Sequence, residues 1–173
     1  MKSWTVFKQD SNKKPHQMVG SVYAVDAETA LLEARTVFAR RPKAVSMWVA
    51  PTETLVSWTK EQLVTANAPA AAATQAEESM WQVFRKVGQR RAMTFVDHVG
   101  DVVGNSAENA LAQARTQFDN GKTVWVWMLI PDNAIARSND EDIESWFKPA
   151  LSKTYKQQSQ YGFVGGKRAK KGT

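Results

Sequence analysis

The residues best suited to acid–base or metal chemistry in this sequence are its two histidines, His16 and His98. Histidine titrates near neutral pH and is the commonest protein ligand of metal ions. The chain has no cysteine and no Glu-x-x-His pair, and these supply the usual ligands of structural zinc and of di-iron sites in helical bundles. We therefore expect no catalytic residue, no metal site and no bound cofactor, and we predict that both histidines are surface or hydrogen-bonded side chains.

The other charged groups have simpler interpretations. Asp140, Glu141 and Asp142 form an acidic run, which is typical of a solvated helix start. Arg35 and Arg115 occupy matching places in two similar stretches of the chain, where a structural ion pair, a contact across an internal interface or an anion site would each explain them. The sequence has no Gly-x-Ser-x-Gly, Walker loop or Gly-x-Gly-x-x-Gly, the signatures of hydrolases and nucleotide-binding enzymes.

These similar stretches belong to an internal duplication. Residues 20–38 and 100–118 are identical at ten of nineteen positions, far above the roughly one or two matches expected from average residue usage. Two further pairs of blocks match in the same order: Trp-Thr-Val-Phe (4–7) with Trp-Gln-Val-Phe (81–84), and 46–51 with 126–131. The order of the three blocks indicates that one unit was copied.

Each copy is predicted to fold as strand, strand, helix, strand. Alternating apolar residues rich in aromatic and β-branched types indicate the strands, and Asp26 and Ser106 are good N-caps for the helices. Leu31, Ala34 and Phe38 share one helix face, which residues 111, 114 and 118 repeat. The predicted strands are 4–7, 18–25 and 44–50 in the first copy, and 81–84, 94–103 and 123–130 in the second.

These elements predict an α+β fold made of two tandem ββαβ repeats. A unit near 60 residues buries too little surface to be stable alone, so we expect the copies to pack about a pseudo-two-fold axis as an internal dimer. Trp48 and Trp127 are expected to be core or interface aromatics. The predicted organisation is a first repeat (1–64), an Ala/Pro linker (65–79), a second repeat (80–137) and an extended C-terminal arm with a basic tail (138–173).

The C-terminal arm has no counterpart between the copies. Four of the six net positive charges lie within residues 167–171, so the body is nearly neutral. This Gly-rich tail is either a solubilising segment or an electrostatic contact for an acidic partner. Five aromatic side chains either pack on the protein's own body or form a docking arm, since Trp and Tyr are common interface anchors: Trp146, Phe147, Tyr155, Tyr161 and Phe163.

The overall composition favours a globular, cytoplasmic protein. The chain is 43% hydrophobic and 23% charged, a balance typical of folded domains. It has no apolar run of about 18 residues and no apolar segment at its start that would suggest export. We expect no membrane contact, and we consider a nucleic-acid partner the less favoured interpretation of the basic tail.

The order of the motifs resembles the B subunit of the bacterial phenylacetyl-CoA epoxidase (ring 1,2-monooxygenase) complex. That family's pattern runs Trp/Tyr-x-Val-Phe, His-Val-Gly-Ser, Ala-x-Asp-x-x-x-Ala-Leu-x-x-Ala-Arg, Arg-Arg and Ile-Trp-Val, with Pro-Ala-x-Ser-Lys-x-Tyr near the C-terminus. The matching residues are Val6-Phe7, Val19-Gly20-Ser21, Ala24, Asp26, Ala30-Leu31, Ala34-Arg35, Arg40-Arg41 and Trp48-Val49 in the first copy, His98-Val99-Gly100, Ala110-Leu111, Ala114-Arg115 and Trp127 in the second, and Pro149-Ala150, Ser152-Lys153 and Tyr155 in the arm. The chain departs from the family in its fusion of two copies and in Lys156-Gln157-Gln158, where the family has Arg-His-Pro.

The resemblance implies a non-catalytic scaffold subunit in aromatic catabolism. In that family the A subunit carries the di-iron site, a C subunit pairs with it, a reductase delivers electrons, and the B dimer bridges A–C pairs. A fused chain would replace the B homodimer. Partner contacts are expected at Arg35, Arg115, Trp146, Phe147, Lys153, Tyr155 and Tyr161. The alternatives are a small nucleic-acid-binding module that uses the basic tail and, last, an independent enzyme that depends on His98 or Arg115.

Overall fold

The computed structural model of the chain describes residues 1–39, 44–65, 77–88 and 96–152. Within these ranges it is an α+β structure with one antiparallel eight-stranded sheet and four α-helices. The strands are β1 (Lys2–Gln9), β2 (Gln17–Ala24), β3 (Ser46–Pro51), β4 (Val56–Thr59), β5 (Ser79–Lys86), β6 (Asp97–Gly104), β7 (Val126–Pro131) and β8 (Ala136–Arg137). The helices are α1 (Ala27–Phe38), α2 (Lys60–Thr65), α3 (Ala107–Gln117) and α4 (Asp142–Ser152), with 3₁₀ turns η1 (Thr52–Thr54) and η2 (Asp132–Ala134).

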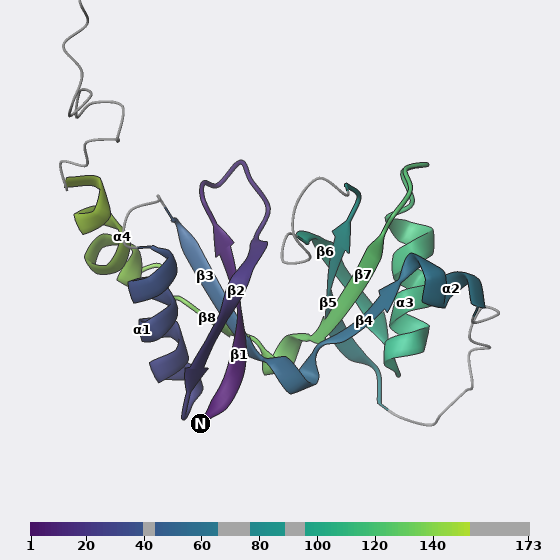
Figure 1. Ribbon diagram of the computed structural model, residues 1–173, viewed down its shortest axis with the longest axis horizontal. Coiled ribbons are helices and arrows are strands. Elements are labelled where there is room, and N and C mark those ends of the chain that lie inside the picture. The colour runs from purple at the N-terminus through teal and green to yellow at the C-terminus, as the bar shows by residue number, and fades with distance from the viewer. Residues whose placement is uncertain (40–43, 66–76, 89–95, 153–173) are drawn as a thin grey trace, which may run out of the picture.

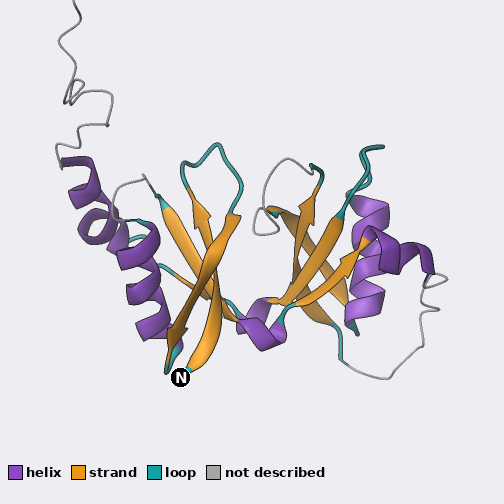
Figure 2. Ribbon diagram, viewed as in Figure 1, coloured by secondary structure: helices purple, strands orange, loops and turns teal. Residues whose placement is uncertain are grey.

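The sheet has the order β4-β7-β5-β6-β2-β1-β3-β8. We call β2, β1, β3 and β8 with helices α1 and α4 the α1 lobe, and β6, β5, β7 and β4 with helices α3 and α2 the α3 lobe. The helices lie on the two outer flanks of the molecule and the strands lie between them (Figure 1, Figure 2). Along the chain, the order strand, strand, helix, strand, 3₁₀ turn, strand, helix occurs twice.

The two lobes exchange strands. β4 comes from the first sequence copy but pairs with β7 of the second, and β8 comes from the second copy but pairs with β3 of the first. At the centre, β2 and β6 share only the residue pair Gln17–Asp97, whose side chains are hydrogen-bonded from Nε2 to Oδ1 at 2.6 Å. Each lobe is therefore completed by a strand from the other copy.

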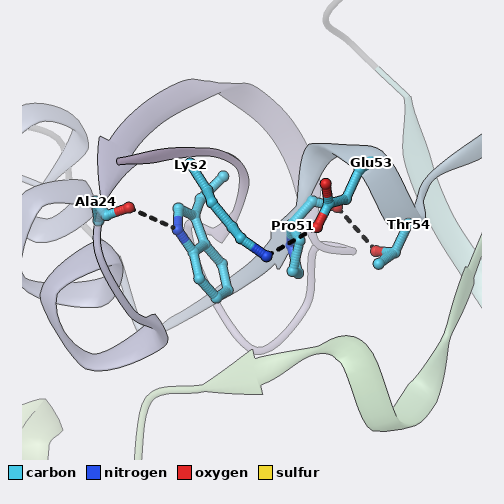
Figure 3. Close-up of polar contacts among 6 residues, drawn as sticks. Lys2, Ala24, Pro51, Glu53 and Thr54 are labelled. Carbon is cyan, nitrogen blue, oxygen red and sulfur yellow. Dashed lines mark hydrogen bonds and ion pairs between the residues drawn. The ribbon is translucent and has the colours of Figure 1, made fainter.

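The turn η1, where the chain leaves the α1 lobe, is fastened by side chains. Lys2 Nζ lies 3.1 Å from Glu53 Oε1, and Thr54 Oγ1 donates a hydrogen bond of 2.8 Å to the carbonyl of Pro51 (Figure 3). Between β1 and the end of β2, the indole nitrogen of Trp4 donates a hydrogen bond of 3.4 Å to the carbonyl of Ala24.

The helices α1 and α3 form where the sequence predicts because each has a cap and an apolar face. Asp26 Oδ1 accepts a hydrogen bond from the amide of Thr29 at 2.8 Å, and Ser106 Oγ accepts one from the amide of Asn109 at 3.1 Å. Such caps stabilise a helix by about 1 kcal/mol. The buried faces of the two helices have the same composition: Ala30, Leu31 and Ala34 in α1, and Ala110, Leu111 and Ala114 in α3.

A β-bulge at the same place in each lobe turns one residue toward the centre of the molecule. The pairing register shifts between Val6 and Phe7 in β1, opposite Gly20 of β2. Gly20 has φ +152° and lies against the Phe38 ring of α1, a conformation that suits glycine. Val19 packs toward α1, whereas Met18 packs in the opposite direction. In the α3 lobe the corresponding bulge, between Val83 and Phe84 of β5, turns His98 toward the centre of the molecule.

The sheet curls so strongly that its inner face folds onto itself. The rings of Phe7 in β1 and Phe84 in β5 are 4.4 Å apart, although a flat sheet would separate these strands by about 14 Å. The rings belong to a central cluster that joins the lobes, made of Phe7, Ala50, Phe84, Val96, Met128, Ile130 and Ile135, with Met18, Trp48, Leu55 and Ala134 packed against it. Two further cores lie beneath α1 and α3.

Strands and helices lie near most of the predicted positions, with ends shifted by a few residues. The short strands β4 and β8 and the helix α2 were not predicted, and α4 extends over eleven residues from the helix start that the acidic run indicated. Most of the predicted linker and the end of the C-terminal arm lie outside the described residues, at 66–76 and 153–173.

Candidate functional site

The two arginines of the duplicated helices face different surroundings. Arg35 on α1 is half-buried and Arg115 on α3 is exposed. Neither guanidinium forms an ion pair within the described ranges, so the structural ion pair suggested by the sequence is not found there. Arg115 lines a pocket of about 230 Å³ between α2 and α3.

The aromatic residues of the arm divide into two groups. Phe147 is 3% exposed and belongs to the core beneath α1, and Trp146 packs against the same core. These two side chains therefore pack on the protein's own body, the first of the two alternatives. Lys153, Tyr155 and Tyr161, the other predicted contact residues of the arm, lie outside the described residues.

Trp48 and Trp127 are both core aromatics but serve different cores. Trp127 is 4% exposed and lies in the core beneath α3, whereas Trp48 packs against the central cluster. The two tryptophans are not equivalent in the alignment of the copies: Trp48 corresponds to Met128, and Trp127 corresponds to Met47. Because successive strand residues point to opposite faces of a sheet, this one-residue offset moves one tryptophan to the centre of the molecule.

Both histidines meet at Trp48 in the centre. The ring of His16 stacks on Trp48 at 3.8 Å between centroids, and the ring of His98 approaches Trp48 edge-on at 5.2 Å. The two imidazole rings are 6.3 Å apart. His16 Nε2 shares a hydrogen bond of 3.0 Å with the hydroxyl of Ser46. The arrangement places two histidines from different sequence copies in one aromatic cluster.

A polar chain extends this cluster to the crossing segments. His98 Nε2 is 2.7 Å from Gln82 Oε1, and Gln82 Nε2 donates to Asp132 Oδ1 at 2.7 Å. The same carboxylate oxygen accepts a short hydrogen bond from Arg137, whose guanidinium lies 4.8 Å from the centre of the Trp48 ring. The chain of contacts thus begins and ends at Trp48, and it connects β3, β5, β6, η2 and β8.

Burial keeps the histidines neutral at physiological pH. It lowers the pKa of His16 from 6.5 to about 3, with the nearby charges of His98 and Arg137 acting in the same direction. Burial also lowers the pKa of His98, against an opposing effect of Asp101. In a neutral imidazole one ring nitrogen donates a hydrogen bond and the other accepts one. Each Nε2 can therefore make its hydrogen bond, to Ser46 or to Gln82, without a charge on the ring.

Among the described residues, the polar chain has no equivalent on the other side of the molecule. The corresponding positions of the other sequence copy hold smaller or apolar residues, where Thr5 and Thr52 share one hydrogen bond of 3.1 Å. These counterparts are Met18 for His98, Thr5 for Gln82, Thr52 for Asp132, Ser57 for Arg137 and Val96 for His16. The two copies have therefore diverged where they meet.

The arrangement is suited to holding the lobes together. Its polar groups are already occupied by one another, and no group of three or more His, Asp, Glu or Cys residues in the described ranges is arranged to hold a metal ion. Sequence reasoning missed Gln82, Asp132 and Arg137. One signal was available for His98, since a residue two positions before a strand glycine is a candidate for reorientation by a bulge.

No helix within the described ranges is long and apolar enough to span a bilayer.

Comparison with known proteins places the chain in a family. No curated protein and no solved structure matches the chain. The sequence pattern of the phenylacetic acid degradation B (PaaB) family matches it twice, at residues 1–77 and at 77–168. The chain therefore belongs to the phenylacetic acid degradation B family and carries that family's pattern in two consecutive copies.

Proposed function

We propose that the chain is a non-catalytic, cytoplasmic bridging subunit of a multicomponent di-iron monooxygenase of aromatic degradation. The observation that carries this proposal is the exchange of β4 and β8 between the lobes. It joins two copies of the family pattern into one sheet within one chain, an arrangement expected when a fused pair replaces a homodimer.

We interpret the molecule as a pseudo-two-fold internal dimer of ββαβ repeats. An axis between β2 and β6 would relate the strands in the order in which they occur from the centre outward: β2 to β6, β1 to β5, β3 to β7 and β8 to β4. The register shifts and the glycine φ angles of +152° and +148° recur at matching places. Such a body has two related flanks, which suits the binding of two partners at once.

The chemistry of the centre supports a non-catalytic role. His16 and His98, which contact Trp48, are the side chains at the centre that acid–base catalysis would use most readily. Both have lowered pKa values, and both bond to side chains of the same chain. We propose that the partners, an A-type subunit with the di-iron site and a C-type subunit, carry out the oxygenation.

Co-expression with candidate A-type and C-type subunits tests this proposal. With an affinity tag on this chain, we expect A and C to co-purify in one complex by size-exclusion chromatography. Without the chain, A and C should form a smaller assembly, and the purified chain alone should have no oxygenase turnover. The proposal is overturned if A and C reach their full size and activity while this chain elutes separately.

A further inference from the structure

A pocket between α2 and α3 lies next to Arg115. It has a volume of about 230 Å³. Trp127 is its most buried lining residue, and Val124 and Leu63 are half-buried. Val64 of α2 is 75% exposed beside it. The exposed polar residues that line the pocket are Lys60, Arg115 and Asp119.

In the α1 lobe, the same place is filled by an aromatic side chain of the protein itself. Val124 and Trp127 correspond to Ala44 and Met47 of the first copy. Ala44 and Met47 lie in one core cluster with Phe147 of α4, which is 3% exposed. Figure 1 shows α4 beside α1 and α2 beside α3. The pocket is thus the counterpart of the position that Phe147 fills.

The helix α2 of the first sequence copy carries no aromatic residue, and the aromatic side chain that the first copy brings to this core is Trp58 of β4. The helix α2 has six residues, against eleven in α4. The residues that correspond to Trp146 and Phe147 are Ala66 and Asn67, and no aromatic residue occurs from 66 to 80. Within the described residues, the core of the α3 lobe is covered by the partly buried side chains of Trp58 and Leu63, and α2 contributes no buried aromatic side chain like Phe147 of α4.

The charge around the pocket is opposite to that of the helix that fills its counterpart. Lys60 and Arg115 contribute two positive charges against the one negative charge of Asp119, and neither cation forms an ion pair within the described part of the chain. Lys60 corresponds to Asp140, which begins the acidic run ahead of α4. A segment with α4-like charges would meet attraction here, because complementary charges favour and orient association.

We propose that this pocket is the docking site for a helical segment of a partner protein, which inserts an aromatic side chain between α2 and α3 and sets a carboxylate against Arg115 and Lys60. The identification of that partner with an A-type or C-type subunit rests on the proposed function. A buried aromatic anchor with a charged rim is the usual composition of an interaction hot spot. The described part of the chain offers this site on one flank, so the two flanks bind partners unequally.

A peptide tests the pocket independently of any complex. The probe is a capped synthetic peptide with the sequence of residues 139–152, added to the ¹⁵N-labelled full-length chain and followed by NMR. We expect shifts at residues around Arg115 and at least tenfold weaker binding to Arg115→Glu. Arg35→Glu, the matched control in the other lobe, should bind within about twofold of the unsubstituted chain, because surface substitutions away from a contact have small effects.

Three results of the peptide experiment would overturn the proposal. The first is no binding at about 1 mM peptide, a dissociation constant that corresponds to about −4.1 kcal/mol of binding free energy. The second is an equal loss of binding in Arg35→Glu and Arg115→Glu. The third is undiminished binding of a peptide that carries Phe147→Ala.

The complex tests the source of the segment. In an assembly reconstituted with A-type and C-type subunits, Arg115→Glu should lose one of two A–C pairs. Lys13→Glu, a charge reversal at an exposed residue outside the pocket, should retain both. Full assembly of Arg115→Glu would overturn the identification of the partner. If the unsubstituted chain binds the peptide but no A–C pair, the proposed function fails and the pocket remains a docking site for another protein.

Discussion

Acidification from pH 7 to pH 5 should destabilise the protein through His16. Its pKa is about 3 in the folded protein and 6.5 as its ordinary value. Between these values the unfolded chain binds a proton that the folded chain does not, so stability is full above pH 6.5 and falls as the pH decreases. pH 5 lies about 1.5 pH units below the ordinary pKa, and each unit costs about 1.4 kcal/mol, so the unfolding free energy should fall by about 2 kcal/mol. The lowered pKa of His98 adds to the fall in the same direction.

Urea denaturation followed by tryptophan fluorescence at the two pH values measures this loss. His16→Gln is the control, because its amide keeps a polar group near Ser46 but does not titrate in this range. The fall in unfolding free energy between pH 7 and pH 5 should be smaller in the variant by about 2 kcal/mol. Carboxylates contribute little in this window, since those with resolved shifts have pKa values below their ordinary ones. An equal fall in the two proteins would refute the assignment of His16 as a buried neutral side chain.

Two core substitutions test the packing of the lobes. Gly100→Ala should cost about 2–4 kcal/mol of unfolding free energy, because an alanine would be strained at φ +148° and its Cβ would lie 2.6 Å from Cζ of Phe118. Gly88→Ala is the control, because a Cβ there has no neighbour within 4 Å. Its unfolding free energy should stay within about 0.5 kcal/mol of that of the unsubstituted chain. Similar losses at both sites would contradict the bulge geometry. Phe147→Ala should lower the unfolding free energy, measured by urea denaturation, by about 3–5 kcal/mol through loss of its core contacts. Lys148→Ala, on the exposed side of α4, should have little effect. A Phe147 variant as stable as the Lys148 variant would show that α4 does not pack on the α1 lobe.

The helices and the long strands were predictable because their signals are local. A cap at Asp26 or Ser106, an apolar face repeated every third or fourth residue and a run of alternating apolar residues depend only on neighbours in the sequence. The second copy doubled each of these signals. The internal duplication therefore predicted most of the elements and the two cores beneath the helices.

The strand exchange was not predictable from these signals. β4 has four residues and β8 has two, too few to show a period. Their partners belong to the other copy, so the pairing is visible only once the curled sheet has brought the lobes together. The polar chain from His98 to Arg137 was missed for the same reason, since a bulge turns His98 inward and the crossing at η2 brings Asp132 and Arg137 to it.

The pocket beside Arg115 also depends on tertiary structure. Arg35 and Arg115 look equivalent in sequence, and their helices have the same cap and the same buried face. Their surroundings differ because the chain that returns to each lobe after the exchange is different: α4 brings Phe147 to one, and α2 brings Leu63 and Val64 to the other.

Native mass spectrometry of the complex with A-type and C-type subunits tests the central claim most directly. If the fused chain replaces a bridging homodimer, the intact complex should contain one copy of this chain for every two A–C pairs. A complex with two copies of the chain for the same two A–C pairs, or A–C pairs joined without it, would contradict the account.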